Sequence, residues 1–316
     1  MRRAFTFLEL IFVIIVIGIL AKFGTNLMMT AYTAYAASTI NNRLQVDAEL
    51  ALKQISNRLQ YRIKDSVIAR ATPGGTFDAL TSADANATIL EWVGYDIDGW
   101  LGTNRAGIGG EPVFNRPTWS GVIDVDDAAA VAALSYLQSP GTDTTLANNV
   151  IQSIRANGSA TGIANAAVFF TGANSDVQTD YGWDGSVQAT QSTTAAHPIT
   201  NAGAGSLSQL VDATAGPSTF TNTDVYENYK LAWTAYAIRI MDNDADGDND
   251  LVLYYDYQPW AGEDFLNDGT AILLLPNVDT FKFSGMGDTI RLQVCVNEEN
   301  SLGEGLYAIC KETAIF

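Results

Sequence analysis

The sequence predicts an α+β protein in which a long N-terminal α-helix, transmembrane in its first half, packs on an antiparallel β-sheet. First, an almost uninterrupted apolar run follows Arg2 and Arg3. Apolar residues then recur every three or four positions to about Arg70, which is the period of one helix face. After the stop signal Thr-Pro-Gly-Gly at 72–75, the period shortens towards two, as in half-buried strands.

The apolar run from Phe5 to Ala21 has the length of a membrane span. At about 1.5 Å per residue it covers about 25 Å, which is at the short end of the range for a membrane-spanning helix. Thr6 and Glu9 are its only strongly polar residues. Lys22 can direct its ammonium group to the interface, which extends the span to residue 28. The two arginines before the run keep the extreme N-terminus cytoplasmic.

Residues 2–10, RRAFTFLEL, resemble the prepilin signal of type IV pilins and type II secretion pseudopilins. The resemblance implies a leader of residues 1–4, removed by a prepilin peptidase between Ala4 and Phe5, and N-methylation of Phe5. It places Glu9 at the fifth mature position, where the family's glutamate is thought to meet the N-terminal ammonium of a neighbouring subunit during assembly. Two charges stranded in lipid would both gain from that pairing. Ala4 departs from the glycine that is usual before the cleavage site.

An ordinary secretory signal peptide is the alternative interpretation of this N-terminus. It would explain the arginines and the apolar run, with an A-x-A-like cleavage site at Ala34-Tyr35-Ala36. It does not explain Glu9 near the start of the run, nor the helical period that continues after it.

The second half of the helix, residues 29–72, is expected to be amphipathic. Its apolar residues form one stripe that must pack on something, and in pilins this is the subunit's own sheet. The stripe consists of Ile40, Leu44, Ala48, Leu52, Ile55, Leu59, Ile63 and Val67.

Residues 73–316 are expected to form a periplasmic, β-rich globular domain with a polar insertion at about 140–220. A short helix is expected at 147–156 and a loop at 190–208. The last six strands are closely spaced and suggest an antiparallel meander. The expected strands are Thr88–Asp96, Val122–Val125, Ala167–Phe170, Trp233–Met241, Leu251–Tyr257, Ala271–Leu275, Thr280–Phe283, Thr289–Val296 and Leu306–Cys310.

Cys295 and Cys310 are the only two cysteines. Export to an oxidising compartment favours a disulfide between them, and two reduced thiols are the alternative. Many pilins close a C-terminal loop with one disulfide, so the resemblance points the same way.

An acidic turn, DNDADGDND at 242–250, resembles the start of an EF-hand calcium loop, with Gly247 after the third alternating carboxylate. Leu253 replaces the bidentate glutamate, and the flanks are predicted strands, so the hypothesis is a hairpin loop that binds Ca²⁺. A solvated acidic turn is the alternative. The candidate ligands are Asp242, Asp244, Asp246, Asp248 and Asp250.

Charge and the missing motifs exclude several classes of function. The net charge is −18 with only 17 Lys and Arg, which disfavours direct nucleic-acid binding. His197 is the only histidine, which excludes multi-histidine zinc sites, and it is expected to lie in a surface loop. No nucleotide-binding glycine motif occurs. With these classes disfavoured, the resemblance of residues 2–10 to the prepilin signal implies a non-enzymatic minor pilin or minor pseudopilin that is anchored in the inner membrane and assembles with other such subunits. A pilus-associated adhesin is the alternative, and an anchored periplasmic enzyme is less favoured.

Overall fold

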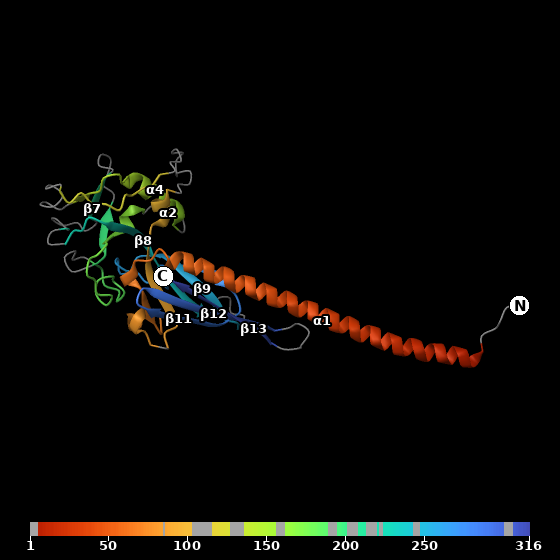
Figure 1. The fold of residues 1–316 in the computed structure, drawn as a ribbon. Helices are drawn as coiled ribbons and strands as arrows, with labels where there is room; N and C mark the ends of the chain where they lie inside the picture. Colours follow the sequence, from red (N-terminus) through yellow and green to blue (C-terminus); the bar gives the residue numbers. More distant parts are fainter. Residues whose placement is uncertain are drawn as a thin grey trace.

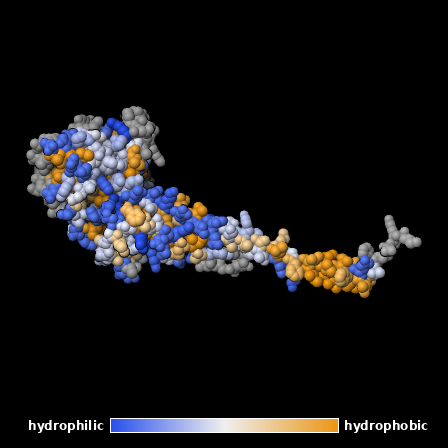
Figure 2. All heavy atoms as spheres, viewed as in Figure 1, coloured by the Kyte–Doolittle hydropathy of each residue, from blue (hydrophilic) through white to orange (hydrophobic). Residues whose placement is uncertain are grey.

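The computed structural model consists of a long helical rod and a β-rich head (Figure 1). The rod is α1, Phe7–Leu59, and its first half extends away from the head. Figure 2 shows hydrophobic side chains along the facing side of the free end of the rod, whereas the facing surface of the head is mixed. The structure describes residues 6–84, 86–102, 116–126, 136–155, 162–188, 195–200, 208–212, 220, 224–242, 247–299 and 306–316.

The second half of α1 packs on the head with the predicted stripe. Leu44, Ala48, Leu52, Ile55 and Leu59 are buried and Ile40 is half-buried, which confirms the helical period up to residue 59. Their apolar surface is the main source of attachment between rod and head.

The prediction that the helix continues to about Arg70, within an amphipathic half at 29–72, is wrong because the chain turns into the sheet after Leu59. Ile63 donates its backbone N–H to Val93 O at 2.8 Å, and Arg62 pairs with Gly94 in an isolated bridge. The 3₁₀ turn η1, Lys64–Ser66, leads into β1, Ile68–Arg70. Sheet pairing therefore overrides the local helical pattern.

The larger sheet is antiparallel and branches at its longest strand, β8, Tyr229–Met241. One edge of β8 pairs with β3, Ile89–Tyr95, and the other edge is shared by two strands. Its start pairs with β5, Ala167–Phe170, and its end with β9, Asp250–Tyr257. Asp256, with a φ of 63°, donates its N–H to Thr234 Oγ1 at 2.7 Å where the two partners diverge.

Short strands and helices complete this sheet and its surroundings. The sheet order is β2-β1-β3-β8-β5-β6-β7-β4, with β9 also on β8 and β10 on β9. The remaining elements are β2 (Phe77–Ala79), η2 (Leu80–Ser82), α2 (Ile97–Leu101), β4 (Tyr136–Gln138), α4 (Thr144–Ile154), η4 (Ile163–Asn165), β6 (His197–Thr200), β7 (Gln209–Asp212) and β10 (Thr270–Leu275).

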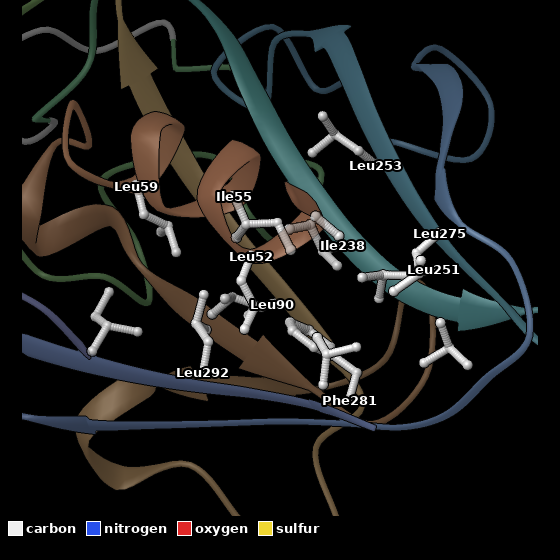
Figure 3. Packing of buried hydrophobic residues seen from close by; sticks show 14 of the residues in the cluster. Leu52, Ile55, Leu59, Leu90, Ile238, Leu251, Leu253, Leu275, Phe281 and Leu292 are labelled. Atoms are coloured by element: carbon white, nitrogen blue, oxygen red, sulfur yellow. The ribbon is translucent and has the colours of Figure 1, made fainter. Parts of the chain in front are cut away.

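A second sheet has three antiparallel strands, and α1 lies between it and the larger sheet. It consists of β11, Val278–Met286, β12, Thr289–Glu299, and β13, Leu306–Ile315. Figure 3 shows Ile55 and Leu59 of α1 between residues of both sheets, such as Ile238 and Leu292. The C-terminal hairpins thus cover the side of the helix that the larger sheet leaves open.

Alternation along the central strands gives the larger sheet a second buried face. On β3, Leu90 and Trp92 face α1, whereas Ile89 and Val93 face a different core. That second core is closed by Tyr181, Trp183, Trp260 and Phe265, all from loop segments. The larger sheet therefore has two packed faces: one covered by α1 and one that points away from it.

Most predicted strands are confirmed, with three differences. Val122–Val125 forms only an isolated bridge at Val122. The predicted loop at 190–208 contains β6 within its described residues. The meander is interrupted, because β10 pairs with β9 and β11 pairs with β12, in two separate sheets.

Candidate functional site

The first half of α1 exposes apolar side chains on every side. Phe7, Leu8 and Phe12 are 78%, 80% and 68% exposed, and the other large apolar side chains along the helix to Met29 are also exposed. This segment is long and apolar enough to cross a membrane: its best 18-residue window has a mean hydropathy of 2.5, and none of that window is buried. In water such a surface is unfavourable, so it requires lipid or protein around it.

Glu9 is the only acidic residue in this apolar segment, and it lies in the first helical turn. Thr6 is the N-cap, and its Oγ1 accepts a hydrogen bond from Glu9 N at 3.4 Å. Thr-x-x-Glu at these positions is the pattern of a capping box, and a carboxylate here also suits the positive end of the helix dipole. The position of Glu9 therefore suits a local capping role as well as the intersubunit role that the resemblance implies. Ala4 and Phe5 lie outside the described residues.

Ion pairs hold the three-stranded sheet against both ends of the packed half of α1. Arg43 pairs with Glu298 near the point where the rod leaves the head. At the other end, Lys64 Nζ lies 2.5 Å from Asp288 Oδ2, and Arg62 donates to Asp288 O at 2.5 Å. The Arg43–Glu298 and Lys64–Asp288 ion pairs are largely exposed and contribute little energy, whereas Arg62 is buried.

The acidic turn joins β8 to β9, as the predicted flanking strands require. Asp242 and Asp248 lie in the loop and Asp250 is the buried first residue of β9, 5% exposed. Gly247 has a φ of 96°, a conformation that side chains disfavour. Asp244 and Asp246 lie outside the described residues. Within the described part of the chain, no group of three or more His, Cys, Asp or Glu residues could hold a metal ion.

Cys295 and Cys310 form a disulfide that links β12 to β13. The two residues are direct partners in the strand register, with their Cα atoms 4.0 Å apart. The sulfur atoms lie on the outer face of the small sheet, because Val294 and Val296 on either side face α1. The bond thus closes the hairpin whose inner face covers the helix.

His197 is buried rather than exposed on a loop, so that expectation is wrong. It lies in β6, is 3% exposed and packs against Phe170, with ring centroids 5.0 Å apart. Burial disfavours the charged imidazolium and lowers its pKa to about 4.

Two buried ion pairs were not foreseen from the sequence. Arg70 Nε lies 2.6 Å from Glu91 Oε1, and Arg155 Nε lies 2.8 Å from Asp256 Oδ1; all four side chains are at most 9% exposed. Burial raises the pKa of Glu91 to about 7, while Arg70 and the hydroxyl of Tyr257 act in the opposite direction. The signal in the sequence was Glu91, a single charged residue in the otherwise apolar strand β3.

Comparison with known proteins gives no relative: no protein-family model, no curated protein and no solved structure matches the chain. Its function must therefore be inferred from its residues and geometry.

Proposed function

We propose that the chain is a minor pilin or minor pseudopilin, a non-catalytic subunit that enters a type IV pilus or type II secretion pseudopilus through α1. The observation that carries the proposal is the rod itself. Its first half is an exposed apolar helix with one carboxylate near its start, and its second half packs on a folded head. The prepilin-like residues at 2–10 support the same interpretation.

The geometry suggests how the rod would act before and during assembly. In the inner membrane, lipid would surround residues 5–28, with the head in the periplasm. In a filament, the same surface would pack against the rods of other subunits, so apolar surface stays buried in both states. Glu9 would lose its partial solvation in that dry core, and the ammonium group of a neighbouring Phe5 would compensate its charge.

N-terminal processing tests the first half of this proposal. Mass spectrometry of the protein from the native host should show a chain that starts at a methylated Phe5. A mature chain that starts near Ala37 would have lost the apolar half of the rod, and the proposal would then be wrong.

Substitutions at Glu9 test the second half and separate pairing from capping. Glu9→Gln keeps the capping-box pattern, because glutamine also serves at that position, but removes the charge. Thr6→Val removes the cap and keeps the charge. We expect Glu9→Gln to reduce incorporation into filaments strongly and Thr6→Val to reduce it weakly. The reverse order would assign Glu9 to local helix capping alone.

A further inference from the structure

A buried carboxyl group joins three segments of the head beside α2 (Figure 1). Asp96 follows β3 and is 1% exposed. Its Oδ1 accepts a hydrogen bond from Gly99 N at 3.1 Å, which caps α2. Its Oδ2 accepts a hydrogen bond from Trp119 Nε1 at 3.2 Å, and its backbone N–H donates to Leu231 O in β8 at 2.7 Å. Asp96 thus ties both α2 and Trp119 to the larger sheet.

Neighbouring atoms enclose this carboxyl group. A Cβ at Gly99 would lie 2.0 Å from Asp96 Oδ2 and 2.5 Å from Thr118 Oγ1, so a side chain at position 99 would displace one of them. Thr118 is buried as well, and its backbone N–H donates to Gly99 O at 2.9 Å. The carboxyl group therefore stays out of contact with solvent as long as α2 and the segment at 116–121 keep these contacts.

No cation pairs with Asp96 in the described parts of the chain. Both hydrogen bonds to its carboxyl group come from neutral donors. Among the described residues, the titratable groups that interact with it are Asp98 of α2, which opposes a second negative charge, and Tyr236 of β8, which brings no positive charge. Arg116 pairs with Asp143 at 2.7 Å.

The uncompensated site favours the neutral form of Asp96. Lys230 of β8 lies over the ring of Tyr95, 4.6 Å from its centroid, and does not compensate the charge of Asp96. A buried carboxylate without a cation is destabilising. Burial raises the pKa of Asp96 from its ordinary value of 3.8 to about 7; its two hydrogen bonds lower the pKa and the charge of Asp98 raises it further. In an open state, in which water solvates the carboxylate, the pKa returns towards its ordinary value.

We propose that Asp96 forms a pH-sensitive clasp, in which the neutral carboxyl group holds α2 and Trp119 against the sheet and the ionised group releases them. Because the pKa is higher in the closed state, the closed state is favoured at low pH. The fraction of open molecules should rise by up to about tenfold per pH unit between about pH 4 and about pH 7, and then level off. The proposal goes beyond entry into a filament, because α1 takes no part in it.

Release of the clasp would change the surface of the head. The Trp119 ring is 1% exposed, and its centroid lies 4.7 Å from that of Trp100, which is 40% exposed. Leu101, the next residue of α2, is 59% exposed. An open clasp would add the Trp119 ring to these exposed side chains, so the pH would control how much apolar surface the head presents.

Amide hydrogen exchange of the full-length protein in detergent, followed by mass spectrometry on peptides that cover residues 96–102 and 116–121, tests the proposal. Asp96→Asn keeps an oxygen for Gly99 N and places an amide group beside Thr118 Oγ1, but it cannot ionise. At each pH, the exchange rate of the wild type divided by that of Asp96→Asn removes the intrinsic effect of pH on exchange. We expect this ratio to rise at least about tenfold from about pH 5 to about pH 8. A ratio that does not change with pH would overturn the proposal.

Asp143→Asn is the matched control. Asp143 also caps a helix, since its Oδ1 accepts a hydrogen bond from Leu146 N at 3.0 Å, but it is only half-buried and pairs with Arg116. The pH dependence of exchange at 96–102 should match the wild type in this variant. Loss of that pH dependence in both variants would show that it does not depend on Asp96 specifically and would overturn the proposal.

A second measurement needs no substitution at Asp96. The indole N–H signal of Trp119 in the NMR spectrum, assigned by its absence in Trp119→Phe, should change with a midpoint at about pH 7, because the indole donates to Asp96. A signal that stays constant from about pH 5 to about pH 9 would contradict the clasp, even if Asp96→Asn did not fold. Since filament entry depends on α1 and the clasp lies in the head, either proposal can fail while the other holds.

Discussion

Removal of Arg70 tests the electrostatics of the buried pair in the head. In the Arg70→Met variant the apolar stem is largely kept, while Glu91 loses a guanidinium 2.6 Å from its Oε1. The carboxyl group keeps only the hydrogen bond from Tyr257 Oη at 3.0 Å and stays 2% exposed. Breaking a buried pair on one side costs about 3–5 kcal/mol, a large part of the 5–15 kcal/mol that typically stabilises a domain.

The loss of stability in Arg70→Met should depend on pH, and the pKa of Glu91 determines the direction of that dependence. Burial raises the pKa of folded Glu91 from its ordinary value of 4.5 to about 7, so the folded state binds this proton more tightly than the unfolded state. The contribution of Glu91 to stability is therefore greatest below pH 4.5 and falls as the pH rises to 7. Without Arg70, which lowers the pKa of Glu91, the carboxyl group keeps its proton to a higher pH, and the fall continues above 7.

Urea denaturation in detergent, followed by tryptophan fluorescence, measures the free energy of unfolding of the full-length protein and of its Arg70→Met variant at each pH. We expect Arg70→Met to lose about 3–5 kcal/mol at pH 9 and distinctly less at pH 5. Arg43→Met is the control, because its pair with Glu298 is exposed and should be worth less than about 1 kcal/mol at either pH. An equal loss at both pH values in Arg70→Met would refute the reasoning.

Further expectations concern the rod, the hairpin and the acidic turn. Ile55→Ala should cost about 2–5 kcal/mol in urea denaturation because Ile55 is fully buried, whereas Leu50→Ala on the exposed side should change stability by no more than about 0.5 kcal/mol. Replacing Cys295 and Cys310 together by serine should cost about 3 kcal/mol by the chain-entropy model; an unchanged urea midpoint would contradict it. If the predicted calcium loop is correct, calorimetry with millimolar Ca²⁺ should give a heat signal that Asp248→Asn reduces, and the absence of any signal would end that hypothesis.

The sequence predicted the rod well because its signals are local. A long apolar run and a helical stripe need only neighbouring residues, and both appear up to Leu59. The predicted end failed because Ile63 and Val67 continue the spacing of the stripe. Val67 does join the same core as Leu59, but it does so from the extended segment before β1. The spacing of apolar residues indicates which side chains are buried. It cannot by itself show whether their backbone is helical or extended.

The Arg70–Glu91 pair could not be located from the sequence because the two residues are brought together only by the sheet. Arg70 and Glu91 are neighbours through the pairing of Arg70 with Ile89 and of Ile68 with Glu91 on adjacent strands. Trp183 reaches them from a loop that carries no regular pattern. The strand alternation in β3 did contain a hint, since Glu91 interrupts a run of apolar residues, and a lone charge in a buried strand requires a partner.

The two faces of the larger sheet explain why this chain is larger than a rod and a sheet require. The face towards α1 is covered by the C-terminal hairpins, which complete the packing of the helix. The opposite face could be closed by apolar loops alone, yet it contains the buried Arg70–Glu91 pair. An indole N–H without a partner among the described residues occurs on each face, at Trp92 and at Trp183. Buried polar groups of this kind cost stability compared with an apolar core of the same volume. The proposed assembly through α1 would not require that cost, so the proposed function leaves the buried pair on the opposite face unexplained.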